Sequence, residues 1–145
     1  MQAVTCLIAR EVDVYVAIGR GRDLAGSIGF DEIDRTRIEI VILELARNIL
    51  AHAGSGALLL EALEQDGRRG LAVEARDDGP GIPDIGLAMR DGYSTANTLG
   101  AGLPGVKRLM DSFEIRSEVG VGTQVRAIRW LDERGAYSRL RGRRP

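Results

Sequence analysis

The segment from residue 31 to 53 constrains the fold of this chain most strongly. Its apolar side chains recur every three or four residues, at Ile38, Val41, Ile42, Leu45, Ile49 and Leu50. That spacing puts them on one stripe of an α-helix, and such a stripe has to be covered by another element. Asp31 or Asp34 can cap the helix, and Gly54 can end it. We therefore predict a long helix packed against a second layer.

Strands for that layer are predicted on both sides of the helix. Residues 57–65 ("ALLLEALEQ") and 70–77 ("GLAVEARD") read as a hairpin that turns over residues 66–70. Residues 112–130 read as a second hairpin that turns over 119–122. A further strand is expected at the N-terminus, over 3–11.

The remaining segments complete the expected order. A first helix starts at Val14, is capped by Asp13 and is closed by Gly29. A long loop covers 79–101, and a short helix covers 103–110. The order strand, helix, helix, strand, strand, loop, helix, strand, strand favours an α+β fold, a two-layer sandwich.

Composition narrows the function classes. The 145 residues fit one domain over 1–132 and a basic tail over 133–145, expected either to be frayed or to contact an acidic partner. With 20 basic and 21 acidic residues, no overall field points to nucleic acid. No apolar run reaches the roughly 20 residues of a membrane span, so we expect a cytoplasmic protein. The single cysteine, Cys6, excludes an internal disulfide and is expected to be buried.

Polar residues follow one edge of the helical stripe. Glu44, Asn48 and His52 are spaced four apart and so share a helix face, with Arg47 beside them. A carboxylate and an amide oxygen suit a hard cation such as Mg²⁺, which keeps few protein ligands when it is carried by phosphates. The alternative is an ordinary solvated helix face.

Two glycine-rich stretches suggest close backbone approach to a ligand. "DDGPGIPD" begins at Asp77, directly after a predicted strand, and suits the edge of a flat ligand such as a purine. "GAGLPG" (100–105) opens a helix, where free N–H groups and the helix dipole favour a phosphate. Neither stretch is a dinucleotide fingerprint or a P-loop.

The order of these motifs resembles the GHKL ATPase superfamily. "ELARN", "DDGPGI", "GAGL" and "GVGT" occur in that order across roughly residues 35–126. More narrowly, "ELARNILAHAG", "DGYST" and "GAGLPGVKRLMDSFEI" resemble the RsbT-type switch serine kinases of bacterial stressosome pathways. The resemblance implies the Bergerat fold, with a mixed, mainly antiparallel sheet covered by helices on one face, and it implies ATP and Mg²⁺ as cofactors.

The resemblance also assigns roles to single residues. It implies that Glu44 is the general base, that Asn48 binds Mg²⁺ and that Asp77 accepts a hydrogen bond from the adenine amino group. His52 is expected near the nucleotide. The other residues implied in cofactor binding are Gly79, Gly81, Ile82, Gly100, Ala101, Gly102, Leu103 and Thr123. The cation at the γ-phosphate is left open among Arg47, Arg90, Lys107 and Arg108.

Among the functions of this superfamily, a stand-alone kinase is favoured. A histidine kinase needs a phosphoacceptor histidine, and the only histidine here, His52, lies in the nucleotide helix. A gyrase or Hsp90 relative needs a large transducer domain. The resemblance implies a serine/threonine kinase acting on a small STAS-domain antagonist, with a stressosome-type scaffold and a downstream phosphatase as further partners. The alternative is a non-catalytic, nucleotide-gated binding switch.

Overall fold

The computed structural model describes residues 2–90 and 102–131. The described residues form the elements β1 Ala3–Ile8, α1 Glu11–Ile28, α2 Glu32–His52, β2 Gly56–Gln65, β3 Arg68–Asp77, α3 Ile85–Ala88, α4 Gly102–Leu109, β4 Ser112–Glu118 and β5 Gly122–Trp130. The predicted tail, 133–145, lies outside the described residues, as do residues 91–101 of the predicted loop.

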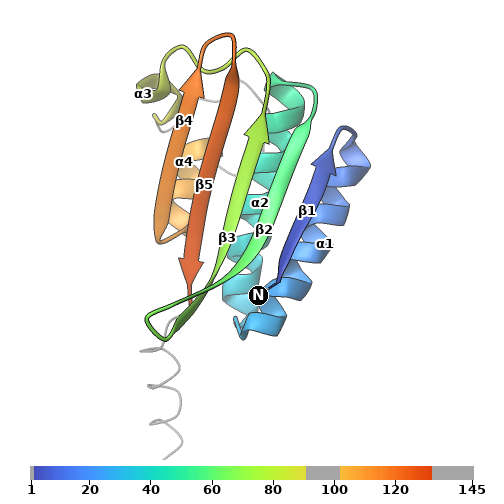
Figure 1. The fold of residues 1–145 in the computed structure, drawn as a ribbon, viewed down its shortest axis with the longest axis vertical. Coiled ribbons are helices and arrows are strands. Elements are labelled where there is room, and N and C mark those ends of the chain that lie inside the picture. The colour runs from blue at the N-terminus through green and yellow to red at the C-terminus, as the bar shows by residue number, and fades with distance from the viewer. Residues whose placement is uncertain (1, 91–101, 132–145) are drawn as a thin grey trace, which may run out of the picture.

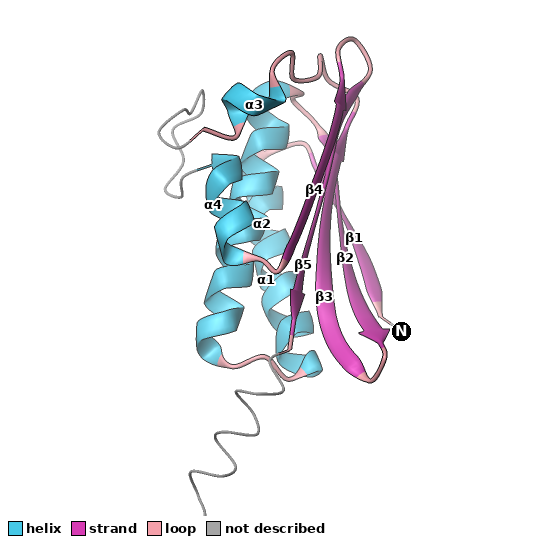
Figure 2. Cartoon of the chain, turned by 90° about the vertical axis from the view of Figure 1, so that its left-hand side faces the viewer, coloured by secondary structure: helices cyan, strands magenta, loops and turns pink. Residues whose placement is uncertain are grey.

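The strands form one sheet in the order β1-β2-β3-β5-β4, and all four pairings are antiparallel (Figure 1). Helices α1, α2 and α4 all lie against the same face of this sheet, as the side view shows (Figure 2). The arrangement confirms the predicted α+β sandwich of two layers.

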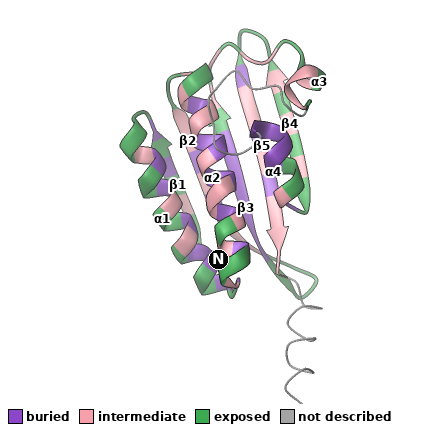
Figure 3. Ribbon diagram, turned by 180° about the vertical axis from the view of Figure 1, so that it is seen from behind, coloured by how far each residue is buried: buried purple, intermediate pink, exposed green. Residues whose placement is uncertain are grey.

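The core consists of buried residues from both layers, and Figure 3 colours these residues on the helices and strands. The stripe of α2 supplies Ile38, Ile42 and Leu45, and the sheet supplies the inward-facing Leu60 and Val73; all five side chains are almost fully buried. Only alternate residues of each strand reach this core, because successive side chains point to opposite faces of the sheet. The predicted stripe of α2 is thus the stripe that packs on the sheet.

Helix α1 starts earlier than predicted, at Glu11 rather than Val14. Asp13 is inside the first turn, where its Oδ2 accepts hydrogen bonds from the backbone N–H groups of Ala9 (3.0 Å) and Arg10 (2.9 Å). The carboxylate therefore reaches back to the residues before the helix instead of capping a later start. Those two hydrogen bonds lower the pKa of Asp13 below its usual range.

A glycine inside α1 has a packing role. A Cβ on Gly21 would overlap the Ile42 side chain of α2, so glycine lets the two helices approach closely. This contact explains why α1 keeps a residue that is unfavourable in helices.

The turns are tighter than the sequence predicted. Asp66 (φ 53°) and Gly67 (φ 77°) alone join β2 to β3, as expected for a two-residue hairpin turn with two positive φ angles. Residues 68–70, predicted to belong to the turn, pair within the hairpin. Strand β5 already begins at Gly122, which shortens the second turn to 119–121. The predicted short helix, α4, begins and ends one residue earlier than expected, at Gly102 and Leu109.

The burial of Cys6 and the character of the helices bear on two further expectations. Cys6 is 7% exposed, which confirms its predicted burial, and that burial raises the pKa of its thiol. In the part of the chain that the structure describes, no helix combines the length and apolar character needed to cross a membrane.

Candidate functional site

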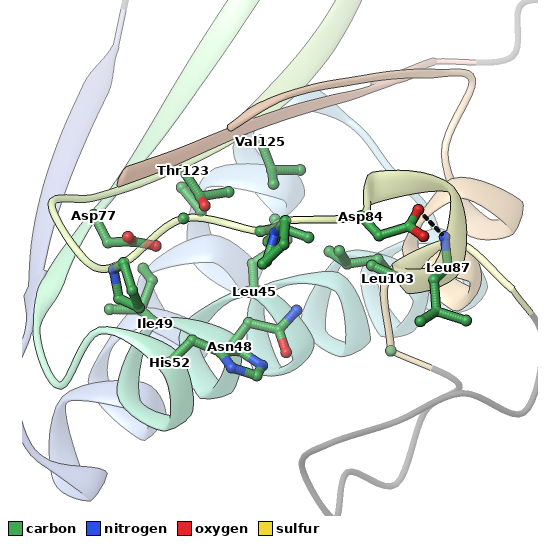
Figure 4. A pocket seen from close by; sticks show the side chains of 17 residues that line it. Leu45, Asn48, Ile49, His52, Asp77, Asp84, Leu87, Leu103, Thr123 and Val125 are labelled. Carbon is green, nitrogen blue, oxygen red and sulfur yellow. Dashed lines mark hydrogen bonds between the residues drawn. The ribbon is translucent and has the colours of Figure 1, made fainter. Parts of the chain in front are cut away.

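A cavity of about 320 Å³ lies between the C-terminal half of α2 and the sheet (Figure 4). Its size is within the range of small-molecule sites. The described residues that line it are Leu45, Asn48, Ile49, His52, Ala75, Asp77, Pro80, Gly81, Ile82, Pro83, Asp84, Leu87, Ala88, Gly102, Leu103, Thr123 and Val125. Segments that are far apart in the sequence therefore come together around one cavity.

Helix α2 gives the cavity both apolar and polar side chains. Leu45 and Ile49 belong to the buried stripe, and Asn48 and His52 follow it along the same side of the helix (Figure 4). The 3.6-residue repeat explains the mixture, because positions 45, 48, 49 and 52 fall on one face. The structure thus brings the predicted Asn48 and His52 together.

Glu44 is placed differently from its neighbours in the predicted polar line. Glu44 is only 1% exposed, and it is not among the described residues that line the cavity. A solvated helix face, the alternative considered from the sequence, does not hold for this carboxylate. Glu44 is a buried charged residue one helical turn before Asn48.

The end of β3 positions Asp77 at the cavity wall. Its Oδ1 accepts a hydrogen bond from the backbone N–H of Gly79 at 2.9 Å, which fixes the carboxylate. Asp77 faces Thr123 of β5 in the strand register, and both residues line the cavity. The predicted Asp77 and Thr123 are therefore neighbours across two strands.

Glycines in the loop after β3 permit close contacts with the rest of the protein. Gly81 has φ +80°, and a Cβ there would collide with the backbone carbonyl of Glu118. A Cβ on Gly79 would be 2.7 Å from the Cβ of Ala53, at the end of α2. Gly81 lines the cavity, whereas Gly79 does not. The structure thus gives Gly79 a packing position beside the site rather than a place on its wall.

The opposite end of the cavity is formed by the start of α4. Gly102, at φ +64°, and Leu103 both line it. The predicted Gly100 and Ala101 lie outside the described residues. Backbone N–H groups in the first turn of a helix lack intrahelical partners, so this end can accept an anion.

None of the four cations considered for the γ-phosphate is among the described residues that line the cavity. Arg47 instead forms an ion pair with Glu11 of α1, with Nη2 2.8 Å from Oε1. This contact ties the beginning of α1 to α2. Arg90, Lys107 and Arg108 are exposed.

Several lining residues were not predicted from the sequence. Ala75 lies two residues before Asp77 and Val125 two residues after Thr123, so strand alternation could have identified both. Leu87 and Ala88 come from α3, a one-turn helix capped by Asp84, whose Oδ1 accepts from the Leu87 N–H at 2.9 Å (Figure 4). A helix this short carries no periodic signal.

Ser117 was not predicted either; it does not line the described cavity but contacts two residues that do. Its Oγ accepts a hydrogen bond from the Ile82 backbone N–H at 2.7 Å and lies 2.8 Å from Oγ1 of Thr123. The register of the β4–β5 hairpin, which pairs Ser117 with Thr123, is the signal that could have found it.

Comparison with known proteins assigns the chain to a family. Residues 9–129 match the model of the histidine kinase-like ATPase domain. The chain belongs to this family. The predicted membership of the GHKL superfamily is confirmed.

Curated relatives agree with the narrower resemblance. The chain is 50% identical over 124 residues to the serine/threonine-protein kinase RsbT of Bacillus subtilis, which covers 86% of this chain and 93% of that kinase. It is 28% identical over 100 residues to the anti-sigma F factor of Caldanaerobacter subterraneus, covering 65% of this chain and 68% of that protein. The identity to RsbT confirms the predicted enzyme class, an ATP-dependent protein serine/threonine kinase.

A solved structure supports the fold. The RsbU and RsbW domains of a Mycobacterium tuberculosis protein match 91% of this chain with a TM-score of 0.60 and 17% identity. This chain spans about a third of the length of that one, 34%. At this identity the likeness extends to the fold alone.

Proposed function

We propose that this chain uses Mg-ATP to phosphorylate a serine or threonine of a small STAS-domain antagonist protein in a bacterial partner-switching stress pathway. A stressosome-type scaffold and a downstream phosphatase are its further partners in this proposal. The observation that carries it is the cavity itself, which has a fixed carboxylate at one end, a helix start at the other and Asn48 on its wall.

The end of the cavity at Asp77 suits adenine. Ile49, Ala75 and Val125 supply apolar surface for a flat base, and Asp77 supplies an acceptor for an amino group. Pockets of this kind combine mainly apolar walls with a few placed polar groups that fix orientation. Of the roles proposed from the family, hydrogen bonding of Asp77 to the adenine amino group is therefore the one that the cavity-lining residues support best.

The end at α4 suits the phosphates. Gly102 begins an eight-residue helix, and its first turn offers backbone N–H groups and the positive end of the helix dipole. Proposed phosphate contacts are Gly102 and Leu103, together with Gly100 and Ala101 just before them. His52 and the loop residues Gly81 and Ile82 would lie along the nucleotide, and Gly79 would support the loop.

The residues present fit a Mg²⁺ ion that arrives with the phosphates. Across residues 2–90 and 102–131, no three His, Cys, Asp or Glu side chains gather into a metal site. Asn48 offers one amide oxygen at the cavity wall, which matches a cation held mainly by phosphate and water. When bound, Mg²⁺ would neutralise charge on the phosphates.

Glu44 is the proposed general base. It lies one helical turn before Asn48, and its burial keeps the carboxylate away from bulk water. In this role it would accept the proton of the incoming hydroxyl group. Phosphoryl transfer depends mainly on positioning and electrostatic stabilisation, so one carboxylate can serve.

The non-catalytic switch is kept as a second candidate because of one observation. Glu44 does not line the described cavity, so the described residues alone do not bring it to the nucleotide. In that case ATP would only shape the surface that captures the partner.

Transfer of label from γ-labelled ATP to a STAS protein distinguishes the two candidates. We predict transfer by the wild type and a rate about 10²–10⁴-fold lower for Glu44→Gln, because Gln keeps the shape but cannot take a proton. Nucleotide affinity should change little. Glu64→Gln, at an exposed position near the end of β2, is the matched control and should transfer normally.

Two outcomes would contradict the proposal. If neither the wild type nor Glu44→Gln transfers label, yet both capture the STAS protein, the binding switch is correct. If Glu44→Gln phosphorylates at the wild-type rate, Glu44 is not the base.

A further inference from the structure

Ser117 occupies the third position in a row of side chains that crosses the sheet beneath the cavity. The register pairs Asp77 of β3 with Thr123 of β5, and Thr123 with Ser117 of β4. Directly paired residues of antiparallel strands point to the same face, here the face that packs on the helices. Asp77 and Thr123 line the cavity, while Ser117 contacts the cavity only through its neighbours.

The first of those neighbours is the loop after β3. The Ile82 backbone N–H donates to Ser117 Oγ at 2.7 Å, and the side chain of Ile82 lines the cavity. A second hydrogen bond, from the Gly120 N–H to the Pro80 carbonyl at 2.9 Å, ties the same loop to the β4–β5 turn. Ser117 therefore holds a loop residue that forms part of the cavity wall.

The second neighbour is Thr123. Ser117 Oγ lies 2.8 Å from Thr123 Oγ1 and 3.3 Å from the Gly122 carbonyl oxygen. A serine hydroxyl has one proton, and its oxygen already accepts from Ile82. That proton goes either to Thr123 or to Gly122.

The choice decides what Thr123 offers to the cavity. If Ser117 donates to Gly122, Thr123 can donate to Ser117 and presents only lone pairs to a ligand. If Ser117 donates to Thr123, over the shorter of the two distances, the Thr123 proton is released toward the cavity. Asp77 and Thr123 then present an acceptor beside a donor, which complements the amino group and adjacent ring nitrogen of adenine.

We propose that Ser117 is a positioning residue for the base: its hydroxyl holds Ile82 in place and lets Thr123 act as a donor to the ring nitrogen next to the adenine amino group. The inference rests on the proposed nucleotide-binding function. It assigns to Ser117 a part of base selectivity, although Ser117 does not touch the base.

The test compares ATP with 1-deaza-ATP, in which that ring nitrogen is replaced by C–H and the amino group is kept. The wild type should bind ATP more tightly. Ser117→Ala should weaken ATP binding about 3- to 10-fold, the range of one net hydrogen bond, and weaken 1-deaza-ATP less. The preference for ATP should therefore fall.

A second variant shows whether Ser117 acts through Thr123. Thr123→Val removes the proposed donor and should lower the preference for ATP to a similar level. Adding Ser117→Ala to Thr123→Val should leave that preference unchanged, because coupled residues are not additive. A merely structural role would weaken both nucleotides by the same factor.

Controls keep the result interpretable. Ser112→Ala makes the same change at an exposed position of β4 and should bind both nucleotides as the wild type does. Ser117→Thr retains the hydroxyl and should restore the preference. If Ser117→Ala does not fold, Ser117→Cys, which keeps the shape but hydrogen-bonds weakly, replaces it and should show the same fall.

Separate outcomes overturn separate claims. A Ser117→Ala or Ser117→Cys protein with the wild-type preference for ATP contradicts the role of Ser117, as does an equal further fall in the Thr123→Val background. A folded wild type that binds neither nucleotide contradicts the proposed function itself.

Discussion

Asp77 shows how one hydrogen bond can define the chemistry of a site. Its Oδ1 is already occupied by the Gly79 N–H, so the carboxylate is held in one orientation at the cavity wall. In the proposed complex this orientation presents an acceptor to the adenine amino group. A neutral amide at the same place could satisfy Gly79 only by turning its NH₂ group the other way.

We therefore predict that Asp77→Asn weakens ATP binding by about 1.5–3 kcal/mol, the usual value of a hydrogen bond to a charged group. The reason is that two donors, the Asn NH₂ and the adenine amino group, would face each other. Purine riboside triphosphate, which lacks the amino group, should lose much less affinity. Titration of both nucleotides measures this, with the exposed Asp78→Asn as the control. Equal losses for the two nucleotides would place Asp77 away from the amino group.

At the scale of elements, the β4–β5 turn and the loop after β3 form one unit. Gly81 packs against the Glu118 carbonyl, and Gly120 donates to Pro80. Gly81 (φ +80°) and Gly120 (φ +83°) have nearly the same backbone conformation, but a Cβ on Gly120 would meet nothing within 4 Å. The same substitution at these two positions therefore separates the cost of backbone strain from the cost of steric crowding.

We predict that Gly120→Ala costs about 1–2 kcal/mol of stability, the cost of a left-handed conformation for an L-residue. Gly81→Ala should cost more than this, because its Cβ must also displace the Glu118 backbone. It should weaken ATP binding as well, since the loop lines the cavity. Denaturant unfolding and nucleotide titration of the two variants measure these effects. Equal stability losses would contradict the crowding at Gly81.

The start of α1 gives a pH-dependent prediction. Hydrogen bonds from the Ala9 and Arg10 N–H groups lower the pKa of Asp13, so its folded pKa is below its unfolded one. The stabilisation is therefore complete above the unfolded pKa, about 3.9, and is lost as the pH falls through the folded pKa. Asp13→Ala should lower the Tm at pH 7, and the difference from the wild type should shrink in acid. Asp23→Ala, exposed on the same helix, is the control. A constant difference from pH 7 into the acid range would show that the ionised carboxylate is not responsible.

For the molecule as a whole, the sequence predicted the elements that have strong periodic or glycine signals. The apolar stripe of α2 is long enough to specify both its helix and its buried face. The two hairpins follow from alternating strands around turn residues, and they produce the antiparallel sheet of the structure. The glycine motifs bring Asp77, Gly81 and Gly102 to one cavity because they occur where a strand ends or a helix begins.

The features that were missed depend on tertiary contacts. The burial of Glu44 could not be predicted from its position one turn before Asn48. Residue spacing identifies the face of the helix but does not say how completely other elements cover that face. The start of α1 was misplaced because Asp13 can cap forward or reach backward with the same side chain. Ser117 is brought beside Thr123 by a strand register that is fixed only when the hairpin pairs.

Titration calorimetry of the wild-type chain with ATP tests the central claim most directly, namely that the cavity between α2 and the sheet is a Mg-ATP site. We predict saturable binding of one ATP per chain in the presence of Mg²⁺, and weaker binding when EDTA removes the metal, because Asn48 would then lose its link to the phosphates. The absence of binding by the folded protein at millimolar ATP and Mg²⁺ would contradict the account.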